Sequence, residues 1–107
     1  MRVELHPEAR AEFRSGVLWY EERRDGLGEE FVAAVDAALL RIATAPKLFP
    51  RWAGTEESPA VIRKVPVERF PYVIAFEQHK RYALVLAVAH QKRRPLYWLT
   101  RANQQPG

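Results

Sequence analysis

The sequence contains no cysteine and only three histidines, His6, His79 and His90, which lie far apart. Without cysteine the chain can form neither a disulfide framework nor a thiolate metal site, and the histidines lack metal-ligand spacing. The longest apolar run, Tyr82 to Ala89, is far shorter than the roughly 20 residues of a membrane-spanning helix. The first residues also lack an apolar signal core. We therefore expect no metal, no cofactor and no membrane partner, and we expect the cytoplasm as the compartment.

Acidic residues are scarce in the second half of the chain. Residues 1–60 carry 8 Lys and Arg against 11 Asp and Glu, a net of −3, whereas residues 61–107 carry 9 against 2, a net of +7. The overall charge is +4. A half-chain this basic favours an anionic partner, either nucleic acid or an acidic protein surface.

Length and composition predict a single compact domain over residues 1–107. A chain of this size buries on the order of 65% of its unfolded surface, and 48% of its residues are hydrophobic. The core therefore needs neither a disulfide nor a metal to stabilise it. Residues 103–107 are expected to form a frayed tail.

The first half of the chain has the pattern of a short strand followed by two helices. Arg2 to Leu5 alternates polar and apolar residues, and Pro7 suits the first position of a helix that ends near Arg23 and Arg24. The buried stripe predicted for this helix contains Ala9, Phe13, Val17 and Tyr20. After the breaker cluster at residues 25–28, a second helix stops before Pro46. Its buried positions are Phe31, Val35, Ala38, Leu39 and Ile42. The two helices should form a hairpin.

After a loop from Lys47 to Ala60, the hydrophobic period changes to that of β-strands. Three β-rich runs follow, Val61–Val67, Phe70–Glu77 and Arg81–Ala89, with a short turn at residues 78–80. The predicted fold class is therefore α+β: a short N-terminal strand, a helical hairpin, and a three-stranded antiparallel meander whose sheet packs on the helices.

Both faces of the predicted meander are apolar. Regular alternation places Tyr72, Ile74 and Phe76 on one face, and it likewise places Leu84, Leu86 and Val88 together on one face. The opposite face is apolar as well, with Val73, Ala75, Val85 and Ala87. Because the helical hairpin can cover only one face, the segment after Pro95 or a partner protein must cover the other.

The order of these elements, together with two segments, resembles the RelE/ParE superfamily of bacterial toxins from type II toxin–antitoxin modules. The segments are Phe70-Pro-Tyr-Val-Ile-Ala-Phe76, and Val85-Leu-Ala-Val-Ala-His90 followed by Arg94-Pro-Leu-Tyr-Trp98. They look like the ParE, or plasmid-stabilisation, branch, and the resemblance covers nearly the whole chain. It implies a growth-inhibiting toxin that a co-expressed acidic antitoxin holds inactive. The target that the resemblance implies is DNA gyrase or, as the alternative, messenger RNA on the ribosome.

The alternative target implies endoribonuclease chemistry. Attack by a 2′-hydroxyl needs a base, an acid and cations, but no metal. Residues that could supply these groups are His90, Arg63, Arg94 and Tyr97. The chain departs from the nuclease branch because Tyr72 follows Phe70-Pro71, where that branch often has an arginine after Gly-Tyr. Its terminal catalytic tyrosine also has no unambiguous equivalent between Tyr97 and Trp98. These departures favour a ParE-like toxin, which needs no catalytic side chain.

The ParE-like interpretation assigns two surfaces to the chain. The residues predicted to bind the target are Lys64, Arg69, Lys92, Arg93, Arg94 and Trp98. The residues predicted to bind the antitoxin are Phe13, Val17, Tyr20 and Tyr72. A third interpretation, an inactive remnant or a nucleic-acid-binding accessory protein, is favoured by charge alone.

The same residues also have purely structural interpretations. The strand period allows His90 to close the core, and Tyr97 and Trp98 could pack back on the open sheet face. The cluster Lys92-Arg93-Arg94 could be a solvated turn. Arg63 and Lys64 point to opposite faces of a regular strand, so only one of them can face a shared site.

Overall fold

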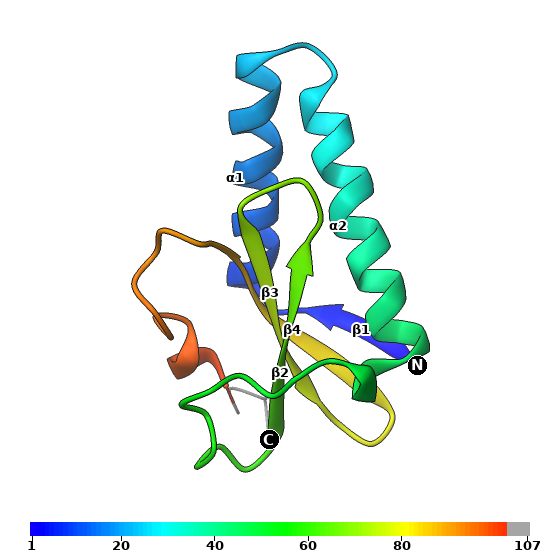
Figure 1. Ribbon diagram of the computed structural model, residues 1–107, viewed down its shortest axis with the longest axis vertical. Helices are drawn as coiled ribbons and strands as arrows, with labels where there is room; N and C mark the ends of the chain where they lie inside the picture. The colour runs from blue at the N-terminus through cyan, green and yellow to red at the C-terminus, as the bar shows by residue number, and fades with distance from the viewer. Residues whose placement is uncertain (103–107) are drawn as a thin grey trace.

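The computed structural model describes residues 1–102, so the tail predicted at residues 103–107 lies outside the described part of the chain. The elements follow in the order β1 (Arg2–Leu5), α1 (Pro7–Arg23), α2 (Leu27–Thr44), β2 (Val61–Val67), β3 (Tyr72–Gln78) and β4 (Tyr82–His90). Short 3₁₀ turns lie at Pro46–Leu48 (η1) and Leu99–Arg101 (η2). Figure 1 shows that α1 and α2 form a hairpin whose closed end projects beyond the sheet. The predicted α+β class and helical hairpin are confirmed.

Both helices bury the residues that their spacing predicts. Pro7 occupies the start of α1, and the His6 Nδ1 atom accepts a hydrogen bond from the Glu8 N–H at 3.1 Å, which satisfies one of the free N–H groups of the first turn. The core under the helices contains Ala9, Tyr20, Phe31, Val35, Ala38 and Ile42, with Phe13, Val17 and Leu39 packed against it. Within residues 1–102, neither helix is long and apolar enough to cross a membrane.

The turn between the helices depends on two glycines and a glutamate. Gly26 has a φ of 88°, in the left-handed region that glycine adopts readily. The Glu21 carboxylate accepts hydrogen bonds from the N–H groups of Gly26 and Gly28, each at 3.0 Å. It thereby caps α2, whose own N-cap residue has no side chain. A Cβ atom on Gly28 would lie 2.8 Å from the Val17 carbonyl oxygen, so the two helix backbones meet closely at this point.

The sheet has the strand order β1-β4-β3-β2. Strands β2, β3 and β4 form the predicted antiparallel meander, and β1 joins it in parallel beside β4, with Leu5 opposite Val85. Strands β3 and β4 begin later than predicted, at Tyr72 and Tyr82. For β3 the reason is the preceding turn, where Arg69 has a φ of 75° and the chain straightens only after Pro71.

A β-bulge in β4 changes which side chains share a face. Ala75 lies opposite Ala87 but Phe76 lies opposite Val85, so Leu86 has no partner in β3. Consequently Val85 and Val88 pack in the core under the helices, whereas Leu84, Leu86 and Ala87 pack on the other face. The predictions that Leu84, Leu86 and Val88 share a face, and that Val85 shares one with Ala87, are therefore wrong. An extra residue in one strand shifts its alternation by one.

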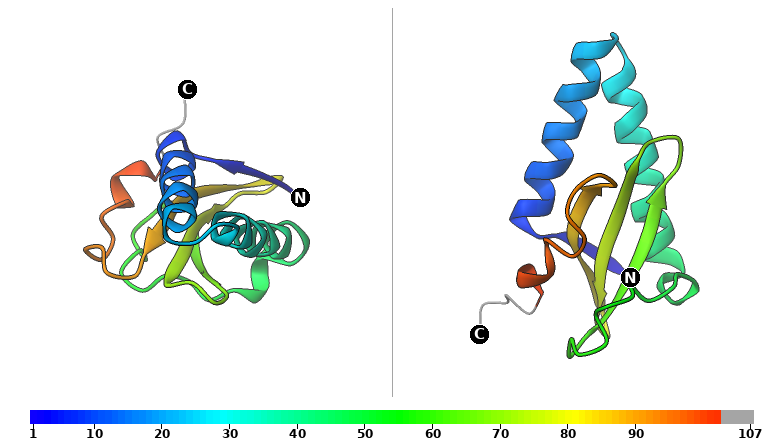
Figure 2. Two further views of the ribbon diagram at one scale, coloured as in Figure 1. Left: turned by 90° about the horizontal axis from the view of Figure 1, so that it is seen from above. Right: turned by 60° about the vertical axis from the view of Figure 1, so that its left-hand side comes forward.

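The sheet face away from the helices is covered by the C-terminal segment. Trp98 is 1% exposed and packs there with Ile62, Ala75 and Leu86. The chain reverses at Leu96, whose φ of 59° is in the left-handed region. Figure 2 shows this segment, in orange and red, beside the sheet and away from α2. Sequence analysis left two candidates for covering this face, the segment after Pro95 and a partner protein. The structure shows the segment after Pro95 in this place.

The loop between α2 and β2 closes one edge of the sheet. The Trp52 N–H donates a hydrogen bond to the Ile62 carbonyl at 2.8 Å, and the Lys64 N–H donates one to the Pro50 carbonyl at 3.0 Å. Further along β2, Pro66 has no N–H to offer. These features block the pairing of another strand at this edge.

The close backbone contact between the helices predicts that Gly28→Ala destabilises the fold. Alanine is the better helix former by about 1 kcal/mol, but the new methyl group would overlap the Val17 carbonyl oxygen. We expect a net loss of about 1–3 kcal/mol in the free energy of unfolding, measured by urea denaturation followed by circular dichroism. Glu29→Ala, at the exposed neighbouring position, should change this free energy by less than about 1 kcal/mol. Equal urea midpoints for the two variants would contradict the prediction.

Candidate functional site

A groove of about 660 Å³ lies between α1 and the end of β4. From α1 it is lined by Glu8, Glu12, Trp19 and Tyr20, and from the other side by Tyr72, His90, Arg93 and Tyr97. The loop after β4, which lies beside α1 in orange in Figure 1, contributes Arg93 and Tyr97 to the lining of the groove. The groove thus combines aromatic walls with charged groups of both signs.

The Glu12 carboxylate organises the base of this groove. It forms a two-point ion pair with the Arg101 guanidinium, with both N–O distances at 3.1 Å, and it accepts a hydrogen bond from the Val88 N–H at 3.0 Å. Arg101 also donates to the Leu86 carbonyl at 2.9 Å. β1 pairs with β4 only as far as Val85. Beyond that point the Glu12 and Arg101 side chains provide the hydrogen-bond partners for the β4 backbone that a neighbouring strand would otherwise provide. The ion pair is shielded, with side chains 16% exposed for Glu12 and 12% for Arg101.

Tyr97 is held by the same carboxylate. Its hydroxyl donates a hydrogen bond to Glu12 at 2.5 Å, and the Arg93 guanidinium lies 3.9 Å from the centre of its ring. Burial and then this hydrogen bond raise the pKa of the Tyr97 hydroxyl well above its usual range. Tyr97 therefore stays protonated, with its proton directed at Glu12 and not into the groove.

His90 packs against the core and also faces the groove. Its ring meets Tyr72 edge to face, with centroids 5.1 Å apart, and its Nδ1 atom accepts a hydrogen bond from the Lys92 N–H at 3.0 Å. Because a backbone N–H can only donate, the proton of the neutral ring must be on Nε2. With the Nδ1 lone pair occupied, His90 offers the groove a hydrogen-bond donor and not a base.

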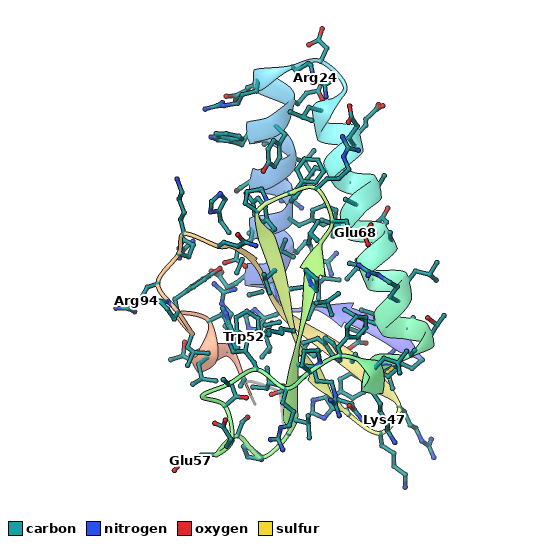
Figure 3. All side chains as sticks on the ribbon, viewed as in Figure 1. Arg24, Lys47, Trp52, Glu57, Glu68 and Arg94 are labelled. Atoms are coloured by element: carbon teal, nitrogen blue, oxygen red, sulfur yellow. The ribbon has the colours of Figure 1, made fainter. Side chains whose placement is uncertain are left out.

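The tip loop, residues 91–95, presents the predicted cluster of cations. Lys92, Arg93 and Arg94 are all exposed, and Figure 3 shows that Arg94 projects outward from the loop. Arg94 lines a smaller hollow with Trp52 and Pro95. The structure therefore brings this cluster together with His90 and Tyr97 at one end of the sheet.

The other predicted cations do not join this cluster, although Arg69, in the β2–β3 turn, lies at the same end of the sheet. Arg63 donates hydrogen bonds to the Gln78 side chain at 2.8 Å and to the Phe49 carbonyl at 2.7 Å. Lys64 points to the opposite face, where its ammonium lies 5.9 Å from the Trp52 ring centre. Arg69 pairs with Glu30 of α2 at 2.8 Å and, together with Arg24, lowers the pKa of that carboxyl. The residues predicted to bind the target therefore do not form one surface.

One of the proposed cleavage residues, Arg63, is separated from the others. Arg63 lies opposite Phe76 of β3, whereas His90 lies opposite Tyr72 at the other end of that strand. Arg63 can therefore not share a site with His90 in this fold. Trp98 needs correction as well. It is 1% exposed and meets Trp52 edge to face, so it has no surface with which to contact a target.

The residues predicted to bind an antitoxin differ in how much surface they offer. Phe13 and Val17 pack against the core, while Tyr20 and Tyr72 contribute to both the core and the groove. Leu18 and Trp19, which the analysis of the sequence missed, are 59% and 50% exposed. Their signal was available, because both are apolar but fall outside the helical spacing of the buried stripe.

The analysis of the sequence also missed Glu12 and Arg101. Glu12 lies three residues after Ala9 and four before Gly16, both of which are buried, so it is an acidic residue on the buried side of α1. That position was a signal that it needs a cationic partner. Nothing in the sequence indicated which lysine or arginine would pair with Glu12.

Comparison with known protein families finds one match, and comparison with solved structures finds a similar fold. A family model described as the ParE toxin of the type II toxin–antitoxin system parDE matches residues 3–95. A solved structure described as the chromosomal ParDE TA system from P. aeruginosa has a similar fold, with a TM-score of 0.66. The match covers 84% of this chain and 95% of that one, at 15% sequence identity. No curated protein matches the sequence significantly.

The shielded ion pair predicts a large cost for Glu12→Ala. Removing the carboxylate leaves Arg101 without its charge partner and the Val88 N–H without an acceptor. We expect the free energy of unfolding to fall by about 2–4 kcal/mol, as measured by urea denaturation followed by tryptophan fluorescence. Glu8→Ala, one turn earlier and exposed, should cost less than about 1 kcal/mol. If both variants unfold at the same urea concentration, the ion pair makes no net contribution.

Proposed function

The chain belongs to the ParE toxin family of type II toxin–antitoxin systems, and we propose that its target is DNA gyrase and that an acidic antitoxin holds it inactive. Family membership makes it the toxin of such a system and implies an antitoxin as partner. The observation that carries the choice of gyrase is the state of the groups that RNA cleavage would use. Three of the four, Arg63, His90 and Tyr97, are held apart or engaged in bonds that stabilise the fold, while Arg94 is exposed on the tip loop.

Arg63, His90 and Tyr97 each have a structural partner. Arg63 is bonded to Gln78 and Phe49, the Tyr97 hydroxyl donates to Glu12, and the His90 Nδ1 atom accepts from Lys92. Cleavage needs a free base and a free acid beside the attacked phosphate. A toxin that acts on gyrase by surface complementarity needs neither, so this arrangement supports the gyrase target.

One observation favours the alternative, an endoribonuclease that acts on messenger RNA at the ribosome. His90, Arg93 and Tyr97 line a single groove. Breaking two hydrogen bonds would free a base and an acid there. The two targets therefore make opposite predictions for substitutions at His90 and Tyr97.

The surface that we propose for the antitoxin is the groove together with the exposed apolar side chains of α1. Trp19 forms one end of it, and the Arg23 guanidinium lies 3.7 Å from the indole ring centre. Tyr20 and Tyr72 add apolar surface, and Arg93 adds positive charge on the far wall. Such a surface fits a segment with both apolar and acidic residues.

His90→Gln and Tyr97→Phe test the target. A nuclease that uses these groups should lose about 10²–10⁴-fold in cleavage rate. A gyrase poison should lose less than about tenfold in potency, because each change removes at most one hydrogen bond. We expect the second result in gyrase supercoiling assays with purified chains, together with trapped cleavage complexes and intact transcripts in cells. Tyr72→Phe, which removes a hydroxyl from the same groove, is the matched control, and circular dichroism checks folding. Codon-positioned transcript cuts that disappear in Tyr97→Phe would replace gyrase with messenger RNA as the target.

Trp19→Ala tests the antitoxin surface. Exposed tryptophans are enriched among the residues that dominate binding energy, so we expect affinity for the antitoxin encoded in the adjoining reading frame to fall by about 30-fold or more. Calorimetric titration of the purified chains measures this. Leu48→Ala, at an apolar residue that is 82% exposed in η1, should change the affinity by less than about threefold. The assignment fails if Trp19→Ala binds as the parent does.

A further inference from the structure

The tip loop carries the longest run of consecutive lysine and arginine residues in the sequence, Lys92-Arg93-Arg94. No Asp or Glu follows Glu77 in the chain, so its sequence neighbours do not offset this charge. The three side chains are exposed, and none of them forms an ion pair within residues 1–102. By contrast, Arg24 and Arg69 share Glu30. The tip therefore presents positive charge that the described part of the chain does not neutralise.

The acidic groups nearest to the tip do not remove this charge. Glu8 and Glu12 face Arg93 across the groove. Glu12 is already paired with Arg101, and Glu8 is an exposed residue in the first turn of α1, where the helix N-terminus favours it. Lys92 and Arg94 do not line that groove. Their charge is available to a partner.

Hydrogen bonds from its backbone N–H groups to Pro71 and His90 hold the tip loop in shape. The Gln91 N–H donates to the Pro71 carbonyl at 2.9 Å, the Arg93 N–H donates to the His90 carbonyl at 3.0 Å, and the Lys92 N–H donates to the His90 ring. The stacking of Arg93 on Tyr97 fixes one of the three side chains. A loop ordered before binding loses less conformational entropy when it binds.

The surface of the tip is polar apart from Pro95. Residues 91–95 include no aromatic or aliphatic side chain other than Pro95. Trp98 is buried and Arg93 covers Tyr97. Protein interfaces usually contain a buried apolar anchor, and recognition of single-stranded nucleic acid uses exposed aromatic rings. The tip offers neither of these. Three adjacent cations on an ordered polar loop suit the phosphates of a duplex, where binding is electrostatic.

We propose that the tip loop is a binding site for the phosphate backbone of duplex DNA, which Lys92, Arg93 and Arg94 contact directly. The toxin would then touch the DNA that its target holds as well as the target protein. The choice of DNA over duplex RNA rests on the proposed gyrase target. The existence of the phosphate site does not, because it follows from the charge and shape of the loop.

The proposal predicts a specific dependence on salt. Each phosphate contact contributes about −0.9 to the slope of log affinity against log salt concentration. Three contacts give a slope of about −2.7, so affinity should fall about 40-fold over a roughly fourfold rise in salt. Fluorescence anisotropy of a labelled DNA duplex of arbitrary sequence, titrated with the full chain at several NaCl concentrations, measures the slope.

The test compares two variants of equal net charge. The tip variant carries Lys92→Ala, Arg93→Ala and Arg94→Ala. The control variant carries Lys47→Ala, Lys80→Ala and Arg81→Ala, which removes three exposed charges elsewhere. Lys47 lies on the opposite side of the molecule from Arg94 (Figure 3), and Lys80 and Arg81 lie in the β3–β4 turn, at the far end of β4 from His90. A third variant, Lys92→Arg with Arg93→Lys and Arg94→Lys, keeps the charge. Circular dichroism checks the folding of all three.

We expect the slope to approach zero in the tip variant, to change by less than about 0.9 in the control variant, and to persist in the charge-keeping variant. Equal losses in the tip and control variants would reduce the effect to overall charge and overturn the proposal. So would full duplex binding by the tip variant, or tighter binding of a labelled single-stranded RNA than of duplex DNA in the same assay. Gyrase is absent from the duplex titration, so failure of the gyrase target would not change that result.

Discussion

The ion pair between Glu12 and Arg101 joins three parts of the chain that the sheet alone does not hold together. β1 stops pairing with β4 at Val85, and the bulge at Leu86 interrupts the register with β3. The Glu12 carboxylate accepts a hydrogen bond from the Val88 N–H, and the Arg101 guanidinium donates one to the Leu86 carbonyl. Neither of these backbone groups is paired with a neighbouring strand. Through these bonds Glu12 and Arg101 attach α1 to β4 and hold the C-terminal segment over the second face of the sheet. A buried backbone group without a partner costs about as much as a lost hydrogen bond, so the side chains substitute for a missing strand.

This arrangement also fixes the site. The same carboxylate holds the Tyr97 hydroxyl, Tyr97 supports the Arg93 guanidinium, and the tip loop lies between Tyr97 and the end of β4. The contact that stabilises the C-terminal segment therefore also shapes the loop that presents the cations. The exposed apolar residues, Leu18 and Trp19, lie on α1 instead. The exposed apolar side chains and most of the tip cations are thus carried by different elements, and only Arg93 of the tip also lines the groove.

Local patterns in the sequence determined the elements and the position of the charge. Helical spacing predicted the buried faces of α1 and α2, and alternation predicted the meander, because both depend on residues close in sequence. The tip cluster could be predicted because Lys92, Arg93 and Arg94 are consecutive, and the match of residues 3–95 to the ParE toxin family bears out the resemblance. Because both faces of the meander are apolar, the sequence also predicted that something covers the second face. It did not decide between the segment after Pro95 and a partner protein.

Only the tertiary structure decided which side chains meet. One extra residue in β4 places Leu84 and Leu86 on the opposite face of the sheet from Val88, so the prediction from regular alternation failed there. The burial of Trp98 and the separation of Arg63 from His90 depend on where the chain returns over the sheet and on strand register. Glu12 and Arg101 are 89 positions apart, and no period in the sequence links residues at that distance. Their pairing exists because the fold leaves two backbone groups open between them.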